Sequence, residues 1–298
     1  MEIKTVKLSE KEETRKFSIL IPSWNNLGFL KLCVESIRKN STFPHQIIVH
    51  VNDGSDGTLA WVREQKLDHT YCAENVGICY AMNMARTLVE TDYIVFMNDD
   101  MYACPGWDAA LWREIEKLDT KYFFLSATMI EPYPTGSKPV IAAKNFGTDL
   151  ATFDEPRLLR EYMSFEKPDW SGATRPPNLV HKDIWDLIGG YSVEFSPGLY
   201  SDPDFSMKLW NAGVRNFRGI GDSRVYHFVS KSLNRISPNN GRIQFLKKWG
   251  ITCSTFYKFY LKKGTPNLGA NLSVDETDPQ YRRALLKCRI ERFLSAFK

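Results

Sequence analysis

The sequence predicts an α/β protein with a mostly parallel, twisted β-sheet flanked by helices. Short apolar runs alternate along the chain with stretches of near-helical apolar spacing, an order that produces parallel strands with helices on both faces. The strong runs end in polar loops, and ligands bind at the carboxyl ends of the strands in such sheets. The chain has 298 residues, of which 43% are hydrophobic and 25% charged. This length and composition support a substantial core and exclude a disordered, collagen-like or disulfide-dense protein.

The alternation is clearest in the first half of the chain. Strands are expected where a short apolar run stops at Pro or at a polar loop, namely over residues 17–22, 47–51, 69–72 and 93–97. Helices are expected in the segments between them, over residues 27–37, 59–65 and 75–88.

The second half is less regular. Residues 123–129 and 225–228 are expected to be strands, and 183–187 and 204–212 short helices. The Pro- and Gly-rich segment 131–137 and the polar segment 154–177 are expected to be loops. Loops of that length in a compact domain are usually functional or mobile.

Charge is distributed unevenly along the chain. The net charge is +4, but residues 228–298 carry fourteen Lys and Arg against four Asp and Glu, a net charge of +10, and residues 1–227 carry −6. A basic tail on an acidic body indicates an acidic or membrane-borne partner for the tail. We do not expect nucleic-acid binding, because no recognised nucleic-acid module accompanies the charge.

The six cysteines are scattered without paired spacing, which predicts reduced, buried thiols. The first residues lack the apolar segment of a secretory signal, and no apolar run approaches the roughly 20 residues that span a bilayer. We therefore expect a cytoplasmic protein, in solution or peripheral on the cytoplasmic face of the membrane.

An acidic cluster, Asn98-Asp99-Asp100, directly follows the apolar run at 93–97. Carboxylates packed this closely repel one another, and a divalent cation such as Mg²⁺ or Mn²⁺ offsets their charge. Taken alone, the cluster is more typical of a solvated turn. Its context makes the metal-site interpretation more specific.

Five short blocks share the order and spacing of one enzyme family. They are residues 21–25, 51–55, 75–77 with Asn83, 96–100, and 188–191 followed by 200–205. With these blocks, residues 17–230 resemble the family 2 glycosyltransferases, which are inverting enzymes with the GT-A fold. The resemblance implies a GT-A-like domain over residues 1–230, with a nucleotide half at about 17–110 and an acceptor half at about 111–230. Residues 231–298 would form a basic, mainly helical extension.

The resemblance also implies a nucleotide site. Its residues would be Pro22, Ser23, Trp24, Asn25, Asp53, Asn75, Gly77, Asn98 and Asp99. The indole of Trp24 offers a face on which a base can stack, and Asp53 can accept a hydrogen bond from N3–H of uracil, which favours UDP- or dTDP-sugars. The alternatives are a core aromatic for Trp24 and a turn residue for Asp53.

Residues 98–100 match the family's DXD motif, which implies Asp100 as a ligand of Mn²⁺ or Mg²⁺ and Asp99 as a brace for the ribose. Such a metal neutralises the diphosphate as the glycosidic bond breaks. His227 falls where many relatives carry a histidine that completes the metal or diphosphate site, although a histidine between aromatic residues also fits a core position. Asn98 replaces the first acid of the motif and removes one negative charge.

The acceptor-side signature implies Asp202 as the general base that takes the proton of the acceptor hydroxyl. Ser201 stands where the family usually has Glu. Asp204 is the rival base, and its alternative role is an acid at the start of a helix, where the helix dipole favours it.

Four side chains are candidates for contact with the acceptor or with phosphate. They are Trp170, Arg175, Asp204 and Lys231. Trp170 and Trp185 can stack against sugar rings, but both also fit core positions.

Residues 281–298 predict an amphipathic helix with Leu285, Ile290, Leu294 and Phe297 on one side and Lys and Arg between them. One interpretation packs this apolar side on the body of the protein. The other lays it on anionic lipid, as a lipid-linked acceptor would favour. The two interpretations are compatible.

Together these features predict an inverting, metal-assisted glycosyltransferase of the hexosyl or N-acetylhexosaminyl class. It would use a UDP-sugar donor and a hydroxyl of a glycan or glycolipid acceptor. The weakened acidic motifs at Asn98 and Ser201 keep an alternative open, a catalytically silent nucleotide-sugar-binding scaffold of a glycan assembly complex.

Overall fold

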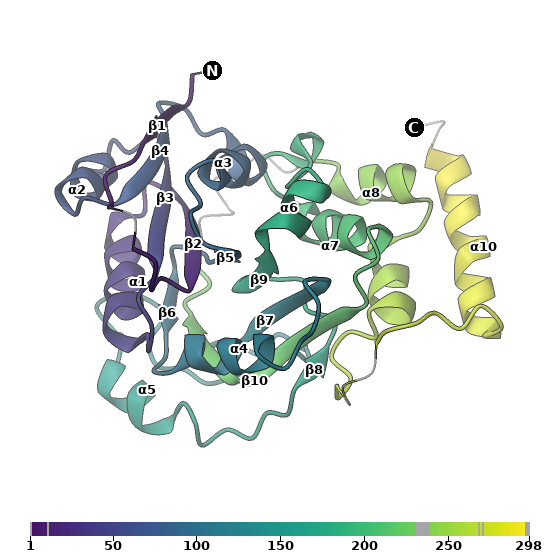
Figure 1. Cartoon of the computed structure of the whole chain (residues 1–298). Helices are drawn as coiled ribbons and strands as arrows, with labels where there is room; N and C mark the ends of the chain where they lie inside the picture. Colours follow the sequence, from purple (N-terminus) through teal and green to yellow (C-terminus); the bar gives the residue numbers. More distant parts are fainter. Residues whose placement is uncertain (1, 11, 231–238, 268, 270, 296–298) are drawn as a thin grey trace.

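The computed structural model describes residues 2–10, 12–230, 239–267, 269 and 271–295. In this part of the chain a ten-stranded sheet runs through the centre in the order β1-β4-β3-β2-β5-β9-β7-β10-β6, and β8 pairs with β10 beside this path. Helices cover both faces of the sheet (Figure 1). The α/β architecture predicted from the sequence is confirmed.

The N-terminal half follows the predicted alternation closely. Its strands are β1 (Lys4–Val6), β2 (Phe17–Trp24), β3 (Gln46–Asn52), β4 (Asp68–Cys72) and β5 (Tyr93–Phe96). Its helices are α1 (Leu27–Asn40), α2 (Thr58–Glu64) and α3 (Gly77–Arg86). Strands β4, β3, β2 and β5 are parallel neighbours, so their carboxyl ends meet at one edge of the sheet. The short β1, which the apolar pattern does not show, adds antiparallel to β4.

The second half makes the sheet mixed. Its elements are β6 (Met101–Ala103), α4 (Trp107–Ile115), β7 (Phe123–Ile130), α5 (Glu155–Glu161), β8 (Trp170–Ser171), β9 (Asn178–His181), α6 (Lys182–Leu187), the 3₁₀ turn η1 (Val193–Phe195), α7 (Ser201–Asn211) and β10 (Asn216–His227). Strand β9 runs antiparallel to both β5 and β7, whereas β10 is parallel to β7 and antiparallel to β6.

Three sequence expectations for this half were incomplete. The strand expected at 225–228 is the end of the twelve-residue β10, whose earlier part is masked in the sequence by Gly, Asp and Arg. The segment 154–177, expected to be a loop, contains α5 and β8. The helix expected from residue 204 begins at Ser201, because Tyr200 in the left-handed conformation (φ 69°) is its N-cap.

Both faces of the sheet are buried, which explains the continuous apolar runs. Along β2, Ile19 and Ile21 pack with α1, α2 and α4 on one face, and Leu20 packs with α3, α6 and α7 on the other. Alternate residues of a strand point to opposite faces. A parallel strand between two helical layers therefore has apolar side chains at almost every position.

The C-terminal extension shares this core. Its elements are α8 (Gly241–Trp249), α9 (Cys253–Thr255), the π-helical turn η3 (Phe256–Tyr260) and α10 (Pro279–Leu294). Phe245, Phe256 and Leu261 are fully buried in the same cluster as Phe124 and Phe217 of the central sheet. Among the described helices, none has the length and apolarity that crossing a membrane requires. All six cysteines are free thiols, five of them buried and Cys253 half-buried.

Candidate functional site

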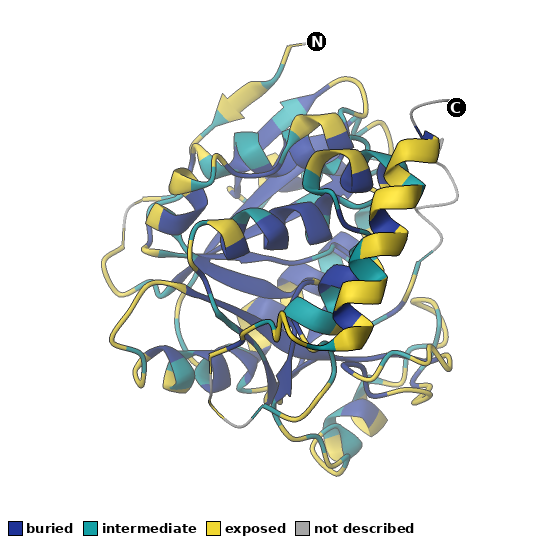
Figure 2. Ribbon diagram, turned by 90° about the vertical axis from the view of Figure 1, so that its right-hand side faces the viewer, coloured by how far each residue is buried: buried dark blue, intermediate teal, exposed yellow. Residues whose placement is uncertain are grey.

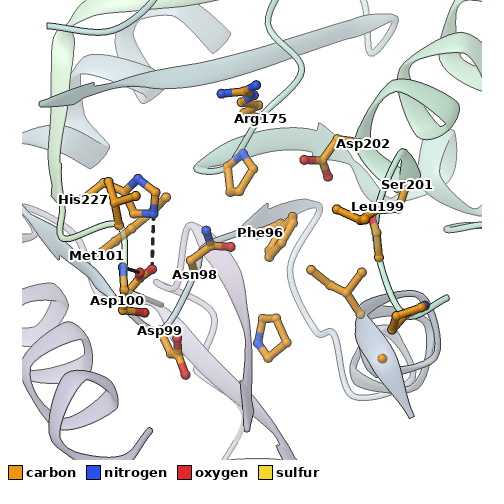
Figure 3. Close-up of a pocket in the computed structure, with 18 of the residues that line it drawn as sticks. Phe96, Asn98, Asp99, Asp100, Met101, Arg175, Leu199, Ser201, Asp202 and His227 are labelled. Atoms are coloured by element: carbon orange, nitrogen blue, oxygen red, sulfur yellow. Dashed lines mark hydrogen bonds and ion pairs between the residues drawn. The ribbon is translucent and has the colours of Figure 1, made fainter. Parts of the chain in front are cut away.

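A cavity of about 1080 Å³ opens where the carboxyl ends of the parallel strands meet the loop before α7. Its walls come from the ends of β2, β3 and β5, from α3, and from the segment 197–203. Figure 3 shows Asp202 across this cavity from the pair Asp100 and His227, with Arg175 between them.

One end of the cavity is built from loops that follow parallel strands. Pro22, Ser23 and Trp24 line it at the end of β2, and Asn75 and Gly77 line it at the start of α3. The backbone N–H of Gly77 donates to Oδ1 of Asn75 at 3.0 Å, a local turn that opens the helix. These five residues, which the resemblance implied as nucleotide-binding, all line the same cavity.

The two other predicted residues of these loops lie just outside the lining. Asn25 Nδ2 donates to Asp53 Oδ2 at 2.7 Å and to Ser55 Oγ at 3.1 Å, so Asn25 and Asp53 brace each other at the rim. Both have positive φ, 45° and 63°, typical of tight turns. Their neighbours Trp24 and Asn52 are the residues that line the cavity.

Gly77, at the start of α3, packs directly against Pro197 in the loop before α7. A Cβ at this position would lie 2.6 Å from Cα and 2.9 Å from the carbonyl oxygen of Pro197, and the backbone φ is +76°. The N–H of Ile78 donates to that same carbonyl at 2.9 Å. Only glycine allows this approach without displacement of backbone, so α3 and the loop before α7 are held in direct contact.

Asn98, Asp99 and Asp100 all line the cavity directly after β5. Ser23 Oγ donates to Asp99 Oδ2 at 2.8 Å, which ties the acidic segment to the end of β2. Asp100 accepts from the backbone N–H of Ser230 at 2.8 Å. Asp99 and Asp100 therefore link the end of β2 to the segment that follows β10.

Buried Asp100 and half-buried His227 form an ion pair, with Nε2 3.4 Å from Oδ1. The antiparallel register of β6 and β10 pairs His227 with Met101, the residue after Asp100, and so brings together residues far apart in sequence. Glu131 lies on the other side of the ring, with its Oε1 2.8 Å from His227 Nδ1. Burial alone would lower the pKa of His227, but the Asp100 and Glu131 carboxylates outweigh burial and raise the pKa to about 9.

The donor set of this pair fits a divalent cation held partly by substrate. In the described residues no cluster of three or more His, Cys, Asp or Glu forms a complete metal cage. Mg²⁺, however, is typically bound by one or two carboxylates together with substrate phosphates and water, and the carboxylate–imidazole pair also suits Mn²⁺. Asp100 and His227 both face the cavity that would contain such phosphates.

Asp202 lies in the first turn of α7 and lines the opposite wall. Its Oδ1 is buried and has no hydrogen-bond partner in the described part of the chain. Burial raises the pKa of Asp202 to about 6, against the opposing positive charges of Arg175 and Lys263. At neutral pH the carboxylate is therefore mostly ionised and able to accept a proton.

The rival acid Asp204 does not line the cavity. It is fully buried, and its Oδ1 accepts from Trp249 Nε1 at 2.8 Å and lies 2.9 Å from Lys248 Nζ. Residues two apart on a helix point about 200° away from each other, so only one of these two acids can face the cavity. Asp204 connects α7 to α8.

The remaining candidates for contact with acceptor or phosphate differ in whether they line the cavity. Arg175 lines the cavity. Trp170 is 6% exposed, donates from Nε1 to Thr128 Oγ1 at 2.9 Å and lies outside the lining, which fits the core position given as its alternative. Trp185 is buried in the core as well. Lys231 lies outside the described residues.

Several residues of the site went unrecognised in the sequence. Glu131 lines the cavity at the end of β7, a strand end that carried the same positional signal as residues 98–100. Cys253 and Tyr257 line it from the C-terminal extension, a placement that no local pattern indicates.

Lys263 lies behind Cys253 and Tyr257. Its ammonium lies 3.9 Å from the centre of the Tyr257 ring and donates to Thr174 Oγ1 at 2.9 Å. Burial and the neighbouring Arg175 lower the pKa of Lys263 to about 8.

Comparison with solved structures supports the fold. TarS of S. aureus, residues 1–349 in complex with UDP-GlcNAc, superposes with a TM-score of 0.57 at 14% identity, covering 94% of this chain and 73% of TarS. GalNAc-T7 with UDP, GalNAc and Mn²⁺ superposes with a TM-score of 0.55 at 11% identity, covering 84% of this chain and 49% of that one. At these identities the likeness shows the fold, which is GT-A-like.

Comparison of sequences identifies the family. An uncharacterised glycosyltransferase, YwdF of Bacillus subtilis (strain 168), is 24% identical over 196 residues, which cover 65% of this chain and 67% of YwdF. The sequence pattern of Glycosyl transferase family 2 matches residues 18–176, more than half of the chain, including the strand ends and the acidic segment that line the cavity. The chain therefore belongs to glycosyltransferase family 2.

Proposed function

We propose that this protein is an inverting glycosyltransferase that moves a sugar from a UDP-sugar to a hydroxyl of a glycan or glycolipid acceptor. The observation that carries the proposal is one cavity with two chemically different walls. The Asp100–His227 pair and the strand-end loops line one wall, and the Asp202 carboxylate lines the other. Such an arrangement leaves room for a sugar between a leaving group and a base.

UDP is the proposed nucleotide, and an N-acetylhexosamine the proposed sugar. TarS was solved with UDP-GlcNAc, and GalNAc-T7 with UDP and GalNAc. Within this chain, Trp24 lines the cavity, and its indole is proposed to stack on the base. Asp53, at the rim beside Trp24, is proposed to accept from uracil N3–H once its bond with Asn25 opens.

Asp100 and His227 are proposed to hold Mn²⁺ or Mg²⁺. When bound, the cation would neutralise negative charge on the departing UDP. Binding requires a neutral imidazole, so His227 must give up its proton when it becomes a ligand. Asp99, held by Ser23, is proposed to brace the ribose.

Asp202 is the proposed general base. The acceptor oxygen forms a bond to the anomeric carbon while its proton passes to the Asp202 carboxylate, and UDP leaves with the electron pair of the old glycosidic bond. Inversion follows because the acceptor attacks from the face opposite the nucleotide. Arg175 is proposed to contact acceptor or phosphate oxygens from beside the base.

In this proposal residues 17–110 bind the donor, as expected from the sequence, together with His227 from the half expected to bind the acceptor, and the rest of residues 111–230 contributes to the acceptor side. Cys253 and Tyr257 extend the acceptor wall into the C-terminal segment. The cytoplasmic location stays a prediction from the sequence.

The second candidate is a scaffold that binds a nucleotide sugar without transfer. Two observations favour it. Asn98 lines the cavity where the family carries an acid, and Ser201 donates its hydroxyl to the carbonyl of Gly198, so no second carboxylate stands next to Asp202.

A nucleotide screen followed by an assay of UDP release separates the two candidates. UDP with Mn²⁺ is expected to raise the thermal unfolding temperature more than GDP or dTDP. At a free UDP concentration 100 times its dissociation constant, the free energy of unfolding should exceed that of the unliganded protein by about 2.7 kcal/mol. UDP release from a UDP-sugar should depend on Mn²⁺ and disappear in Asp100→Ala.

Asp92→Ala, which removes an exposed partner of Lys182 away from the cavity, is the matched control and should keep wild-type release. Tight UDP binding without release by the wild-type protein, with any acceptor, would support the scaffold instead.

A further inference from the structure

The C-terminal helix α10 has two apolar sides, and only one is covered by protein. Tyr281 and Cys288 are buried against the body, and Leu285 packs on the main core. Leu286, Ile290 and Leu294 are 58%, 52% and 56% exposed. The sequence prediction grouped Leu285 with Ile290 and Leu294, but the structure separates them onto different sides of the helix.

The exposed residues form a continuous stripe. Their spacing of four residues places them on one face of the helix, and Phe293, 64% exposed, extends the same face. Cys288 and Tyr281 lie about half a turn away, as helical geometry requires for the opposite side. Figure 2 shows α10 on the surface with its exposed side turned outward.

Basic side chains flank the stripe. By the 100° step of the helix, Arg289 lies on one side of it and Lys287 on the other, and Arg282 and Arg283 lie at its N-terminal end on the same face. All four are exposed. Among the residues described, Arg283, Lys287 and Arg289 form no ion pair, and the one acid of the helix, Glu291, pairs with Arg242 of α8. The helix therefore presents apolar side chains between uncompensated positive charges.

This combination selects among the surfaces that could cover the stripe. A second copy of α10 would place its uncompensated cations against those of the first, which repel. A neutral apolar partner would cover the stripe but gain nothing from the flanking cations. An anionic bilayer surface satisfies both features, because acyl chains receive the apolar side chains while lipid phosphates meet Lys and Arg at headgroup depth.

We propose that α10 docks on an anionic lipid surface through Leu286, Ile290 and Leu294, with Arg283, Lys287 and Arg289 on lipid phosphates. The helix lies flat on the membrane and does not cross it. Membrane docking itself does not depend on the proposed glycosyl transfer. Only its purpose does, which is to hold the cavity near a lipid-linked acceptor.

Contacts beneath α10 connect the docking helix to the cavity. The hydroxyls of Tyr260 and Tyr281 are 2.8 Å apart, and the backbone N–H of Thr252 donates to Cys288 Sγ at 3.3 Å. The segment they hold carries Cys253 and Tyr257, which line the acceptor wall. Helix α10 therefore packs between a membrane on its outer side and the segment that carries Cys253 and Tyr257, which line the proposed acceptor wall.

The test is sedimentation of the full chain with vesicles, without donor or acceptor. The wild-type protein is expected to bind phosphatidylcholine vesicles that contain phosphatidylglycerol, and to bind pure phosphatidylcholine weakly. Leu286→Ser/Ile290→Ser/Leu294→Ser and Arg283→Glu/Lys287→Glu/Arg289→Glu should each lower the partition coefficient by about tenfold or more. Both should keep the wild-type unfolding temperature, since the side chains are exposed.

Leu187→Ser, at a 61% exposed leucine on α6, is the matched control and should bind like wild type. Equal binding by wild type and the apolar triple variant overturns the proposal. So does self-association of the wild type that the triple variant abolishes while neither binds vesicles, because a second copy would then cover the stripe. UDP release by the triple variant should equal that of wild type, so a failure here stays distinct from a failure of the proposed transfer activity.

Discussion

The proposed donor and acceptor walls of the cavity are constructed in different ways. The proposed donor wall is a row of strand ends: residues 22–24 end β2, Asn52 ends β3, and residues 98–100 closely follow β5. The acceptor wall combines Arg175 from the loop before β9, Asp202 from α7, and Cys253 and Tyr257 from the extension. Backbone pairing between parallel strands positions the first wall, and side-chain packing of separate segments positions the second.

This difference has a functional consequence. A wall fixed by strand pairing suits the part of the substrate that recurs, the nucleotide diphosphate. A wall assembled from independent segments can change one segment at a time, as suits an acceptor that differs between enzymes. Substitutions on the two walls should therefore affect different quantities. Changes on the proposed donor wall should alter nucleotide affinity, and changes on the proposed acceptor wall should alter the rate of transfer.

The largest separation is expected for Asp202→Asn. Loss of the base should lower the transfer rate by about 10²–10⁴-fold, because general base catalysis typically contributes that much. UDP affinity should stay near wild type, since the residue lies across the cavity from the donor wall. Transfer kinetics and UDP titration calorimetry measure the two effects.

Asp204→Asn is the comparison for this experiment. It weakens the contacts with Trp249 and Lys248, so it should lower the unfolding temperature and leave the catalytic step of the folded protein near wild type. If Asp204→Asn alone abolishes transfer in folded protein, Asp202 is not the base.

Trp24→Ala should have a smaller effect of the opposite kind, on nucleotide affinity rather than on the transfer rate. Loss of base stacking should weaken UDP binding by about 1–3 kcal/mol, which is about 5- to 150-fold in affinity. With saturating donor, the transfer rate should fall far less. Trp61→Ala on α2, a half-buried tryptophan outside the cavity lining, is the control, and equal loss of UDP affinity in both variants would remove Trp24 from the nucleotide site.

The smallest effect is a shift in pH dependence within the acceptor wall. Asp202 acts as a base only when ionised, so transfer should fall as the pH drops through its pKa of about 6. The positive charge of Lys263 opposes the upward shift that burial causes in this pKa. Lys263→Met should therefore move the acidic limb of the pH–rate profile to higher pH and reduce activity a few-fold at neutral pH.

Lys263→Arg keeps the charge and should preserve the wild-type limb. A limb that stays in place in Lys263→Met would show that Lys263 does not act on the base.

The sequence was most informative where chemistry follows a strand within a few residues. The acidic cluster at residues 98–100 was predicted as a metal site on that basis, and the family resemblance added Trp24 and the role of Asp100; Trp24 and Asp100 both line the cavity. Glu131 occupies an equivalent strand end but lies in a Pro- and Gly-rich stretch, where its polar character passed for that of a loop. The family resemblance supplied Asp202, whose choice over Asp204 depends on the rotation of α7 and on the contact with Trp249.

Long-range packing was beyond the reach of the sequence. Trp170 is a core residue because Gly219 of β10 leaves space for its ring: a Cβ on Gly219 would lie 1.8 Å from the indole. The apolar sides of α10 could not be assigned either. Leu285 and Leu286 are adjacent and identical in type, and only the body of the protein decides which one is covered.

The irregularity in β10 has a consequence for how this site can change over time. Between Ile220 and Arg224 the pairing with β7 shifts register, and from there β10 continues to His227 opposite Met101. Side chains of a strand alternate between faces, so a single deletion between the shift and His227 would turn the imidazole to the other face and put Phe228 where it now meets Asp100. Insertions and deletions are therefore expected to accumulate in the loops and to be rare in residues 224–227. The spacing from the bulge to this histidine is a length that descendants of this chain must preserve, whatever sugar or acceptor they come to use.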